Sequence, residues 1–205
     1  MKYTIMAGLV SLGLFVGAAQ AQESDRNEVS ISATGSFQQS TNGNGIHQSA
    51  SDGAGVLFSY RRFFTDHQGI EVNYGFSRFD QQYNFLNAAT TPLSLSVPAN
   101  ANEATASYIY RLGTHHRLTP FFSAGTGALV FVPDSFGFAS TNGHTFASPD
   151  FVYSAGADVA VSRRVNLRLG YRGHVFNAPD FGVSGINTGS VTHMAQPFGG
   201  VSFHF

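Results

Sequence analysis

The sequence predicts an all-β protein, an eight-stranded antiparallel up-and-down transmembrane β-barrel with short periplasmic turns and long external loops. Three observations predict this fold. Segments of about ten residues alternate apolar and polar side chains, which is the pattern of a strand that crosses a membrane. The connections between these segments are alternately long and short. Opposite charges recur at matching positions of the polar faces, where neighbouring strands would bring them together.

Eight segments carry the alternation. The first shows it plainly, because Val29, Ile31 and Phe37 are separated by serine, threonine and glutamine side chains. The predicted strands cover residues 28–39, 53–63, 69–79, 102–112, 118–131, 151–161, 165–173 and 196–205. Long irregular segments precede the second, fourth, sixth and eighth strands, and short turns precede the third, fifth and seventh. An even number of strands places both ends of the barrel on one side, which this asymmetry makes the periplasmic side.

The composition excludes several other classes of protein. Only 11% of the residues are charged, whereas the chain holds 23 glycines and 20 phenylalanines, which disfavours a soluble helical domain and a disordered chain. The net charge of −1 indicates no basic surface for nucleic acid, so no nucleic-acid partner is expected. The absence of cysteine excludes a disulfide and a thiolate metal site, and no cofactor is predicted.

Residues 1–21 have the features of a secretory signal peptide. Lys2 provides a positive start, residues 5–19 form an apolar run too short for a spanning helix, and Ala19-Gln20-Ala21 is a small-x-small cleavage site. The alternative is a retained N-terminal anchor, which is disfavoured because no cysteine follows for lipidation. We therefore expect residues 22–205 to form one mature domain, the barrel, exported to the cell outer membrane.

The final predicted strand ends on an aromatic residue. Val201, Phe203 and Phe205 fall on one face, which would meet lipid, whereas Phe198 and Ser202 fall on the other. A closed barrel needs such a strand, because its last strand pairs with its first and leaves no edge exposed to lipid. The ending resembles the C-terminal signal of bacterial outer-membrane barrels, which implies that Val201, Phe203 and Phe205 are recognised by the barrel-assembly machinery.

Five charged residues are predicted to form an ionic network inside the barrel. Pairing across the short turns sets Arg61 opposite Glu71 and Asp158 opposite Arg168. Arg111 falls at about the depth of Glu71, so a third match is expected there. A soluble sandwich or lipocalin also alternates, but its charges point outward. The matched charges favour a membrane barrel, whose interior at eight strands is filled by side chains and has no open pore.

Two inner glycines, Gly125 and Gly127, lie in the fifth predicted strand. They do not form a phosphate-binding loop, because the spacing is wrong and no helix follows. We expect them to make room for large neighbours such as Phe121 and Leu129.

Several motifs together resemble the small outer-membrane β-barrel family. They are the signal peptide, the eight strands, PFFSAGTGA in the fifth strand, SAGADVAVSRRVNLRLGYR across the sixth and seventh, and the final GGVSFHF. The family includes the OmpA-type transmembrane domain and OmpX-like and OmpW-like proteins, and the resemblance covers essentially the whole mature chain. It is specific for fold and location and weak for activity. Because a counterpart of the peptidoglycan-binding domain of full-length OmpA is not found, no cell-wall tethering role is expected.

No catalytic or metal site is predicted. The last external loop holds a set of side chains that a lipid-modifying hydrolase could use, namely His174, Asp180, Ser184, Ser190 and His193. A hydrolase would need a nucleophile in hydrogen-bond contact with its base, and neither the spacing nor a nucleophile-elbow motif provides one. His115-His116 is predicted to lie in a tight periplasmic turn, where adjacent side chains point apart and would chelate an ion poorly.

The external loops are unusually apolar for segments that face water. The candidate contact surface consists of Phe136, Phe138, Phe146 and Phe181. Exposed apolar patches mark contact sites, and the alternative is that these side chains pack on one another as a cap over the barrel mouth.

These features lead to three hypotheses about function. The first is a non-enzymatic, monomeric barrel in contact with outer-membrane lipid, with a role in envelope integrity or surface interaction through its external loops. The second is a narrow channel for small or hydrophobic solutes, as the resemblance to OmpW-like proteins implies. The third is a lipid-modifying hydrolase. The sequence does not identify a surface ligand.

Overall fold

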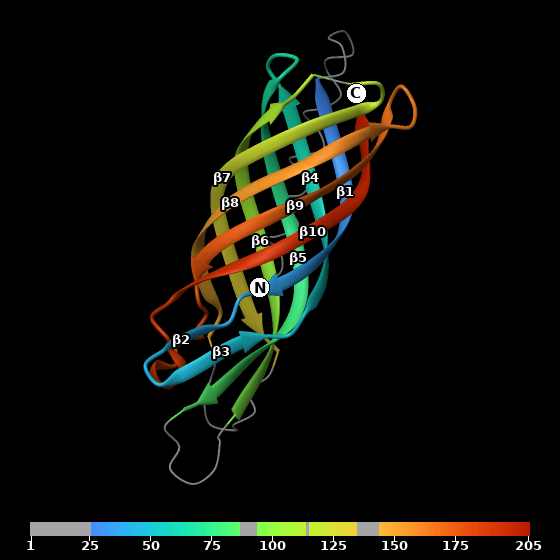
Figure 1. The fold of residues 1–205 in the computed structure, drawn as a ribbon. Coiled ribbons are helices and arrows are strands. Elements are labelled where there is room, and N and C mark those ends of the chain that lie inside the picture. Colours follow the sequence, from blue (N-terminus) through green and yellow to red (C-terminus); the bar gives the residue numbers. More distant parts are fainter. Residues whose placement is uncertain (1–25, 87–93, 114, 135–143) are drawn as a thin grey trace, which may run out of the picture.

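The computed structural model describes residues 26–86, 94–113, 115–134 and 144–205. Their fold is a barrel of long, tilted strands with a small hairpin at one end (Figure 1). The strands are β1 (Asn27–Gln38), β2 (Thr41–Gly43), β3 (Ile46–Ala50), β4 (Gly53–Phe63), β5 (Gln68–Phe85), β6 (Ser94–Arg111), β7 (Leu118–Pro133), β8 (Phe146–Ala160), β9 (Val165–Asn177) and β10 (Val191–His204). One short 3-10 helix, η2 (Ser184–Ile186), lies between β9 and β10.

The barrel is closed. Of the ten strands in the sheet, β2 and β3 form the hairpin, and the other eight pair in the order β5-β4-β1-β10-β9-β8-β7-β6. The circle closes because β6 also pairs with β5, and every pairing is antiparallel. The first barrel strand therefore meets the last, from Glu28 opposite His204 to Gln38 opposite Met194. The predicted eight-stranded up-and-down barrel is confirmed.

The direction of the alternation distinguishes a membrane barrel from a soluble one. Val29, Ile31 and Phe58 point outward with 42%, 52% and 49% of their surface exposed. The residues between them face inward, and the interior encloses Arg61 and Arg168, each 2% exposed. Apolar side chains on the outside and charges on the inside form the arrangement of a barrel in lipid, as predicted.

The strands at the external end are longer than predicted. Residues 80–101 were expected to be irregular, but β5 continues to Phe85 and β6 begins at Ser94, and the two pair throughout. Most inner residues of this extension are apolar, as at Phe79 and Tyr83, although inward Gln81 is polar, whereas the outer ones are polar, as at Arg78 and Gln82. The extension therefore stands in water above the lipid, and its outer face lacks the apolar pattern that predicts a spanning strand.

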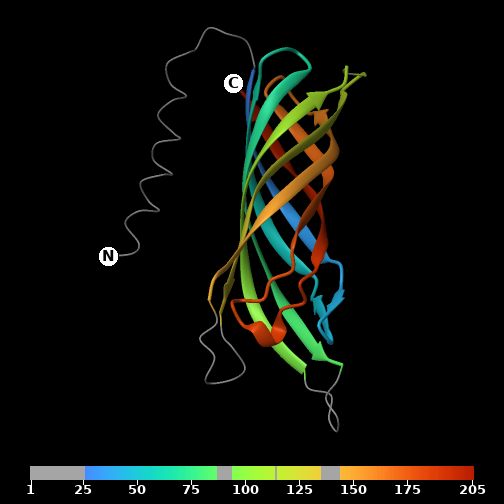
Figure 2. The same ribbon diagram turned by 90° about the vertical axis from the view of Figure 1, so that its left-hand side faces the viewer.

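The same correction applies to three other external segments. Strand β8 begins at Phe146 rather than residue 151, β9 continues to Asn177, and β10 begins at Val191. Residues 41–51, expected as a loop, contain the β2–β3 hairpin, and β3 pairs with the extension of β5. Figure 2 shows the hairpin and the β9–β10 connection together at this end, opposite the short turns.

Close packing inside the barrel depends on glycines, although not in the way predicted. A Cβ on Gly125 or Gly127 would lie 2.1 Å from a carbonyl oxygen of β6, so these two allow the β6 backbone to approach. Room for a large side chain comes instead from Gly156, where a Cβ would lie 2.7 Å from the Phe121 ring. Gly170 has the same relation to Phe198.

The closed barrel predicts heat-modifiable migration on gels. Folded protein in detergent should migrate differently before and after boiling, because every barrel strand is paired on both sides and no edge is open to attack. Identical mobility of boiled and unboiled samples, together with solubility in the absence of detergent, would contradict the membrane barrel. The apolar face of each strand would then have to point into the protein and not to lipid.

Candidate functional site

The candidate site is the barrel interior and the structure that covers its external end. The interior is layered, and successive inward residues of β9 mark the layers. Arg168 belongs to an ionic cluster near the short turns, Arg172 and His174 to a second polar cluster, and Phe176 to an apolar cluster at the external end.

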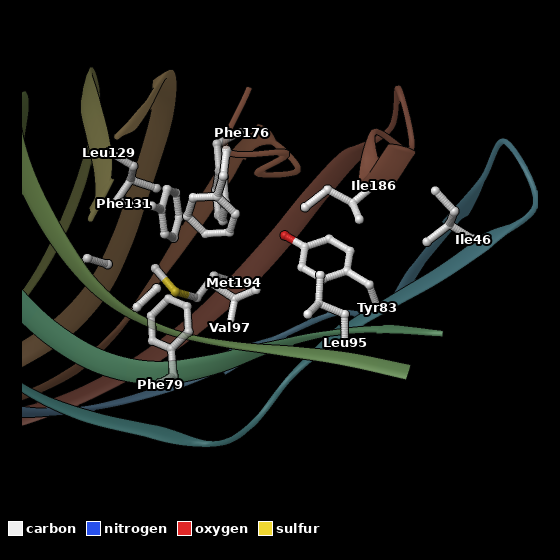
Figure 3. Packing of buried hydrophobic residues seen from close by; sticks show 13 residues of the cluster. Ile46, Phe79, Tyr83, Leu95, Val97, Leu129, Phe131, Phe176, Ile186 and Met194 are labelled. Atoms are coloured by element: carbon white, nitrogen blue, oxygen red, sulfur yellow. The ribbon is translucent and has the colours of Figure 1, made fainter. Parts of the chain in front are cut away.

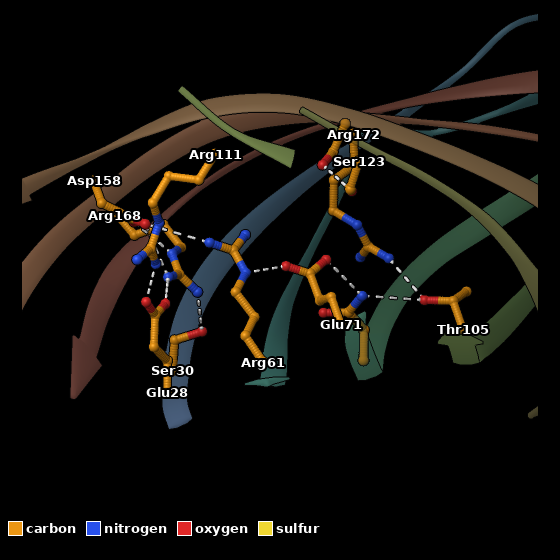
Figure 4. Close-up of polar contacts among 12 residues, drawn as sticks. Glu28, Ser30, Arg61, Glu71, Thr105, Arg111, Ser123, Asp158, Arg168 and Arg172 are labelled. Carbon is orange, nitrogen blue, oxygen red and sulfur yellow. Dashed lines mark hydrogen bonds and ion pairs between the residues drawn. The ribbon is translucent and has the colours of Figure 1, made fainter. Parts of the chain in front are cut away.

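The first ionic cluster contains the predicted charge pairs across two short turns. Arg61 on β4 bonds Glu71 on β5 through its Nε atom, and the two residues are opposite one another in the ladder. Arg168 on β9 donates from Nε to Oδ1 of Asp158 on β8 at 2.6 Å. Arg61 also reaches across the barrel, where its Nη1 lies 3.3 Å from Asp158 Oδ2 (Figure 4).

Glu28 completes the cluster, and the sequence analysis did not include it. It is fully buried, and its carboxylate accepts hydrogen bonds from Arg111 and, at 2.7 Å, from Arg168 Nη2. The predicted match between Arg111 and Glu71 is wrong, because the β5–β6 register places Glu71 opposite Ser107. The signal for Glu28 was available, since pairing of the first two barrel strands, β1 and β4, sets it opposite Arg61.

The first cluster is electrically balanced and sealed by aromatic rings. Glu28, Glu71 and Asp158 face Arg61, Arg111 and Arg168, so three carboxylates meet three guanidinium groups. All three guanidinium groups also lie over rings: the Cζ atoms of Arg61 and Arg168 are 4.1 and 5.7 Å from the centroid of Phe121, and that of Arg111 is 3.8 Å from Phe63. Such stacking stabilises a desolvated cation. The cluster fills this part of the interior.

A second polar cluster lies further from the short turns. Arg172 bonds Glu103 through Nη1, and the same atom donates to Gln196 Oε1 at 2.9 Å. His174 Nδ1 lies 2.7 Å from Asp150 Oδ2, and its Nε2 lies 3.4 Å from Glu103 Oε2. This cluster could not be predicted from the sequence, because its members come from β6, β8, β9 and β10 and no single turn brings them into register.

His174 lies inside the barrel wall and not in an external loop as predicted. It is fully buried on β9, and its ring nitrogens contact Asp150, Glu103 and Gln196. Within the described residues, no hydrogen bond joins it to a serine. Ser190 Oγ instead donates to backbone carbonyls of residues 42 and 188. The set proposed for a hydrolase is therefore not assembled in this structure.

An apolar cluster occupies the external end of the barrel, and we call it the plug. Its thirteen buried members come from the strand extensions, the hairpin and the β9–β10 connection (Figure 3). They are Ile46, Phe79, Tyr83, Leu95, Val97, Ala99, Ala101, Leu129, Phe131, Phe176, Phe181, Ile186 and Met194. Phe131 is at the centre of the aromatic contacts, with its centroid 5.5 Å from that of Phe176 and 6.0 Å from that of Phe79. The plug separates the polar interior from the outside.

The β9–β10 connection is held over the plug by buried hydrogen bonds. The carbonyl oxygen of Pro179 accepts from the hydroxyl of Tyr83 at 2.7 Å and from Gln48 Nε2 at 3.3 Å. Burial, with a smaller contribution from the charge of Asp180, raises the pKa of Tyr83. Tyr83 therefore remains a neutral donor at any physiological pH.

The hairpin and the β9–β10 connection also contact one another, and together we call them the cap. Asn44 Nδ2 donates to the carbonyl of Asn187 at 2.9 Å, and Ser190 Oγ donates to that of Asn42 at 3.0 Å. A Cβ on Gly43 would lie 1.9 Å from the carbonyl oxygen of Thr188, so only glycine allows this approach.

The two described residues of the predicted contact surface, Phe146 and Phe181, do not form an exposed patch. Phe181 is fully buried in the plug, and Phe146 is half-buried at the start of β8 and packs against the plug. Burial of Phe181 corrects the prediction of an exposed contact residue, because covering this ring removes apolar surface from water. Phe136 and Phe138 lie outside the described residues.

The C-terminal residues face outward. Val201, Phe203 and Phe205 are 43%, 41% and 42% exposed on the lipid side, whereas Phe198 and Ser202 are buried in the interior. Their alternation matches the pattern read from the sequence. Their recognition during assembly remains a prediction.

Among the described residues, no group of three or more histidine, cysteine, aspartate or glutamate side chains has an arrangement that could hold a metal ion. The two turn histidines do not point apart as predicted. His115 Nδ1 and His116 Nδ1 are 2.6 Å apart, because His116 adopts a positive φ of 59°.

The family of this chain follows from comparison with known proteins. Residues 7–193 match the family described as outer membrane protein beta-barrel domain. The chain belongs to this family. Membership places the protein in the outer membrane, with the short turns on the periplasmic side. Among the residues that the structure describes, no helix is long and apolar enough to cross a membrane.

Solved structures show the same fold at low sequence identity. Neisserial surface protein A is 17% identical with a TM-score of 0.60, and the match covers 90% of this chain and all of that one. OprG from Pseudomonas aeruginosa is 13% identical with a TM-score of 0.61, covering 87% and 95%. The Ail protein of Yersinia pestis, bound to the heparin analogue sucrose octasulfate, is 13% identical with a TM-score of 0.50, covering 88% and 99%. A search of the curated proteins returns no match.

The ionic cluster predicts a large loss of stability in Arg168→Met. This change leaves Glu28 and Asp158 buried without a main partner, which should lower the free energy of unfolding by about 3–5 kcal/mol. The control is Arg78→Met, since Arg78 pairs with Asp134 on the surface and its side chain is 63% exposed, where about 0–1 kcal/mol is expected. Urea unfolding followed by circular dichroism in detergent measures both. Equal midpoints for the two variants would contradict a stabilising role of the interior network.

Proposed function

We propose that this outer-membrane barrel is a non-enzymatic anchor, closed to solutes, that presents its cap at the cell surface in a structural or surface-interaction role. The observation that supports the proposal is the plug, because thirteen buried apolar residues fill the external end of the barrel. Below it, both polar clusters occupy the remaining interior with paired side chains. The described residues at the external end therefore form an ordered cap and do not line an opening.

The charges at the external end indicate what kind of partner fits. Four aspartates, Asp52, Asp80, Asp134 and Asp180, lie there with a single arginine, Arg78, which is paired with Asp134. Ail is seen with a polyanionic heparin analogue, and a surface with this acidic balance would repel such a ligand. We therefore propose a neutral or basic surface partner.

Secretion and assembly complete the proposal. We propose that residues 1–21 are removed as a signal peptide and that the barrel acts as a monomer. Val201, Phe203 and Phe205 would present the assembly machinery with a row of exposed apolar side chains along β10.

A narrow channel is the second candidate, and one observation favours it. The ladder between β1 and β10 has no paired residues between Thr34 opposite Phe198 and Phe37 opposite Ala195, next to Pro197, which has no N–H to donate. A weakened seam in the wall could open the interior to small solutes and ions.

Conductance separates these two candidates. Because the plug and the ionic clusters fill the interior, the purified protein should give no stable single-channel current in planar bilayers. The Glu71→Gln and Arg168→Gln variants should also give no stable current. A stable current in the wild type that either substitution changes would refute the closed anchor and support the channel.

The contact between the hairpin and the β9–β10 connection predicts the effect of Gly43→Ala. The new methyl group would collide with the carbonyl of Thr188, so the two halves of the cap should separate and residues 178–190 should be cleaved faster by added protease. The matched control is Gly185→Ala in the same connection, where a Cβ would have nothing within 4 Å. Equal cleavage rates in the two variants would show that this contact does not hold the cap.

The same pair of variants tests the surface role. Cells that display the Gly43→Ala protein should lose binding to a surface partner recovered with the wild type, whereas the Gly185→Ala protein should keep it. If the Gly43→Ala protein has an opened cap and still binds the partner as the wild type does, the cap is not the binding surface.

A further inference from the structure

The arginines of this protein divide into three groups with different surroundings. Arg61, Arg111, Arg168 and Arg172 are enclosed in the barrel interior, and Arg78 lies at the external end. The remaining five lie at the periplasmic end, and all five are exposed to solvent. They are Arg26, Arg62, Arg117, Arg163 and Arg164.

These five arginines form one continuous arc of the rim. Backbone hydrogen bonds connect their positions: Ala160 N donates to the carbonyl of Arg117 at 2.8 Å, and His204 N donates to that of Arg164 at 2.9 Å. On the other side of the barrel seam, Phe63 N donates to the carbonyl of Arg26 at 2.9 Å.

The seam itself joins the two halves of the arc. Phe205 and Asn27 exchange backbone hydrogen bonds of 2.9 and 3.2 Å, and Asn27 is opposite Arg62 in the β1–β4 ladder. The arc therefore runs without interruption from the start of β7, through the β8–β9 turn and the end of β10, to the start of β1 and the end of β4 (Figure 1).

In the part of the chain that the structure describes, the arc contains no carboxylate side chain. Within the described chain, none of the five arginines makes an ion pair, and the one hydrogen bond from their guanidinium groups runs from Arg26 Nη1 to the carbonyl of Phe64 at 3.5 Å. One exposed aspartate, Asp66, is found at this end among the described residues, in the β4–β5 turn beyond the arc. Among the described residues, the arginine and aspartate side chains at this end thus carry five positive charges against one negative charge.

Directly beside the arc is the lipid-facing wall. Leu118, Leu167, Phe203 and Tyr60 lie one or a few residues from the arginines, and each is between 38% and 48% exposed on the outer face. Arg62 itself stands on the outer face of β4, opposite Ile70, which is 42% exposed. A row of guanidinium groups at the edge of an apolar wall is placed at the depth of lipid head groups, where long side chains extend from the apolar region to the charged one.

We propose that this arc binds the phosphate groups of anionic glycerophospholipids in the periplasmic leaflet of the outer membrane. The apolar wall beside it contacts the acyl chains, and the arginines supply the fork of donors that suits a phosphate. Arg163 and Arg164, adjacent in one turn, together with Arg117 form the denser half of the site. The inference is independent of the proposed surface role, because it concerns the opposite end of the barrel.

The test measures lipid selectivity in reconstituted vesicles. Electron spin resonance of spin-labelled phosphatidylglycerol and phosphatidylcholine gives their relative association with the wild-type protein. We expect a preference for phosphatidylglycerol of about fivefold for each arginine that contacts a head group, decreasing at high salt. The triple substitution Arg117→Gln, Arg163→Gln and Arg164→Gln should lower that preference by at least about fivefold.

The control is Arg78→Gln, which removes one arginine from the external end and should leave the preference unchanged. Migration on unboiled gels verifies that each variant is folded. Equal association of the two lipids with the wild type would overturn the proposal and would leave the arc as a surface for an acidic protein. An unchanged preference in the folded triple variant, or an equal loss in Arg78→Gln, would also overturn it, because the selectivity would then come from overall charge.

Discussion

The rest of this structure depends on one constraint, which is that charges enclosed by a barrel wall must be neutralised by other side chains of that wall. Removing a carboxylate or a guanidinium group from water costs several kcal/mol unless a partner compensates it. Arg168 on β9 meets this requirement by binding Asp158 on the neighbouring β8 and Glu28 on β1. Arg61 does so by binding Glu71 beside it and Asp158 across the interior. Two of these bonds, from Arg168 to Glu28 and from Arg61 to Asp158, also tie together strands that share no ladder.

The external end follows a different rule, because it lies in water. Beyond the lipid, the outer faces of β5 and β6 can be polar, and the inner faces can be apolar as in a soluble protein. This reversal produces the plug, where Phe79, Tyr83, Val97 and Phe131 pack as a small core. A core at one end and an ionic cluster at the other leave the protein with two independent sources of order. The cap and the membrane-spanning wall are therefore held by different kinds of interaction.

The sequence predicted what depends on neighbours along the chain and missed what depends on closure. Arg61 with Glu71 and Asp158 with Arg168 are joined by short turns, so their register could be counted from the sequence. Glu28 is brought next to Arg168 by pairing between the first and last strands, and His174 contacts Asp150 although the two are not opposite each other in the β8–β9 ladder. The strand extensions were missed because alternation with polar outer residues does not resemble a lipid-facing strand. Phe181 was assigned to the surface because a loop sequence does not show which of its rings turn inward.

The arginines are unevenly distributed over the molecule, which the net charge does not reveal. The chain has a net charge of −1, which suggests an electrically neutral surface. The charges are in fact sorted by depth: the interior is paired, the external end is acidic, and the periplasmic rim is basic along a single arc. Rim positions such as Arg163 and Arg164 are free of the packing constraints that fix Arg61 and Arg168, so the fold alone does not require a cation there. A contiguous row of exposed guanidinium groups that the fold does not need is better explained by what it meets outside the protein, and at this depth that is the phosphate layer of the lipid.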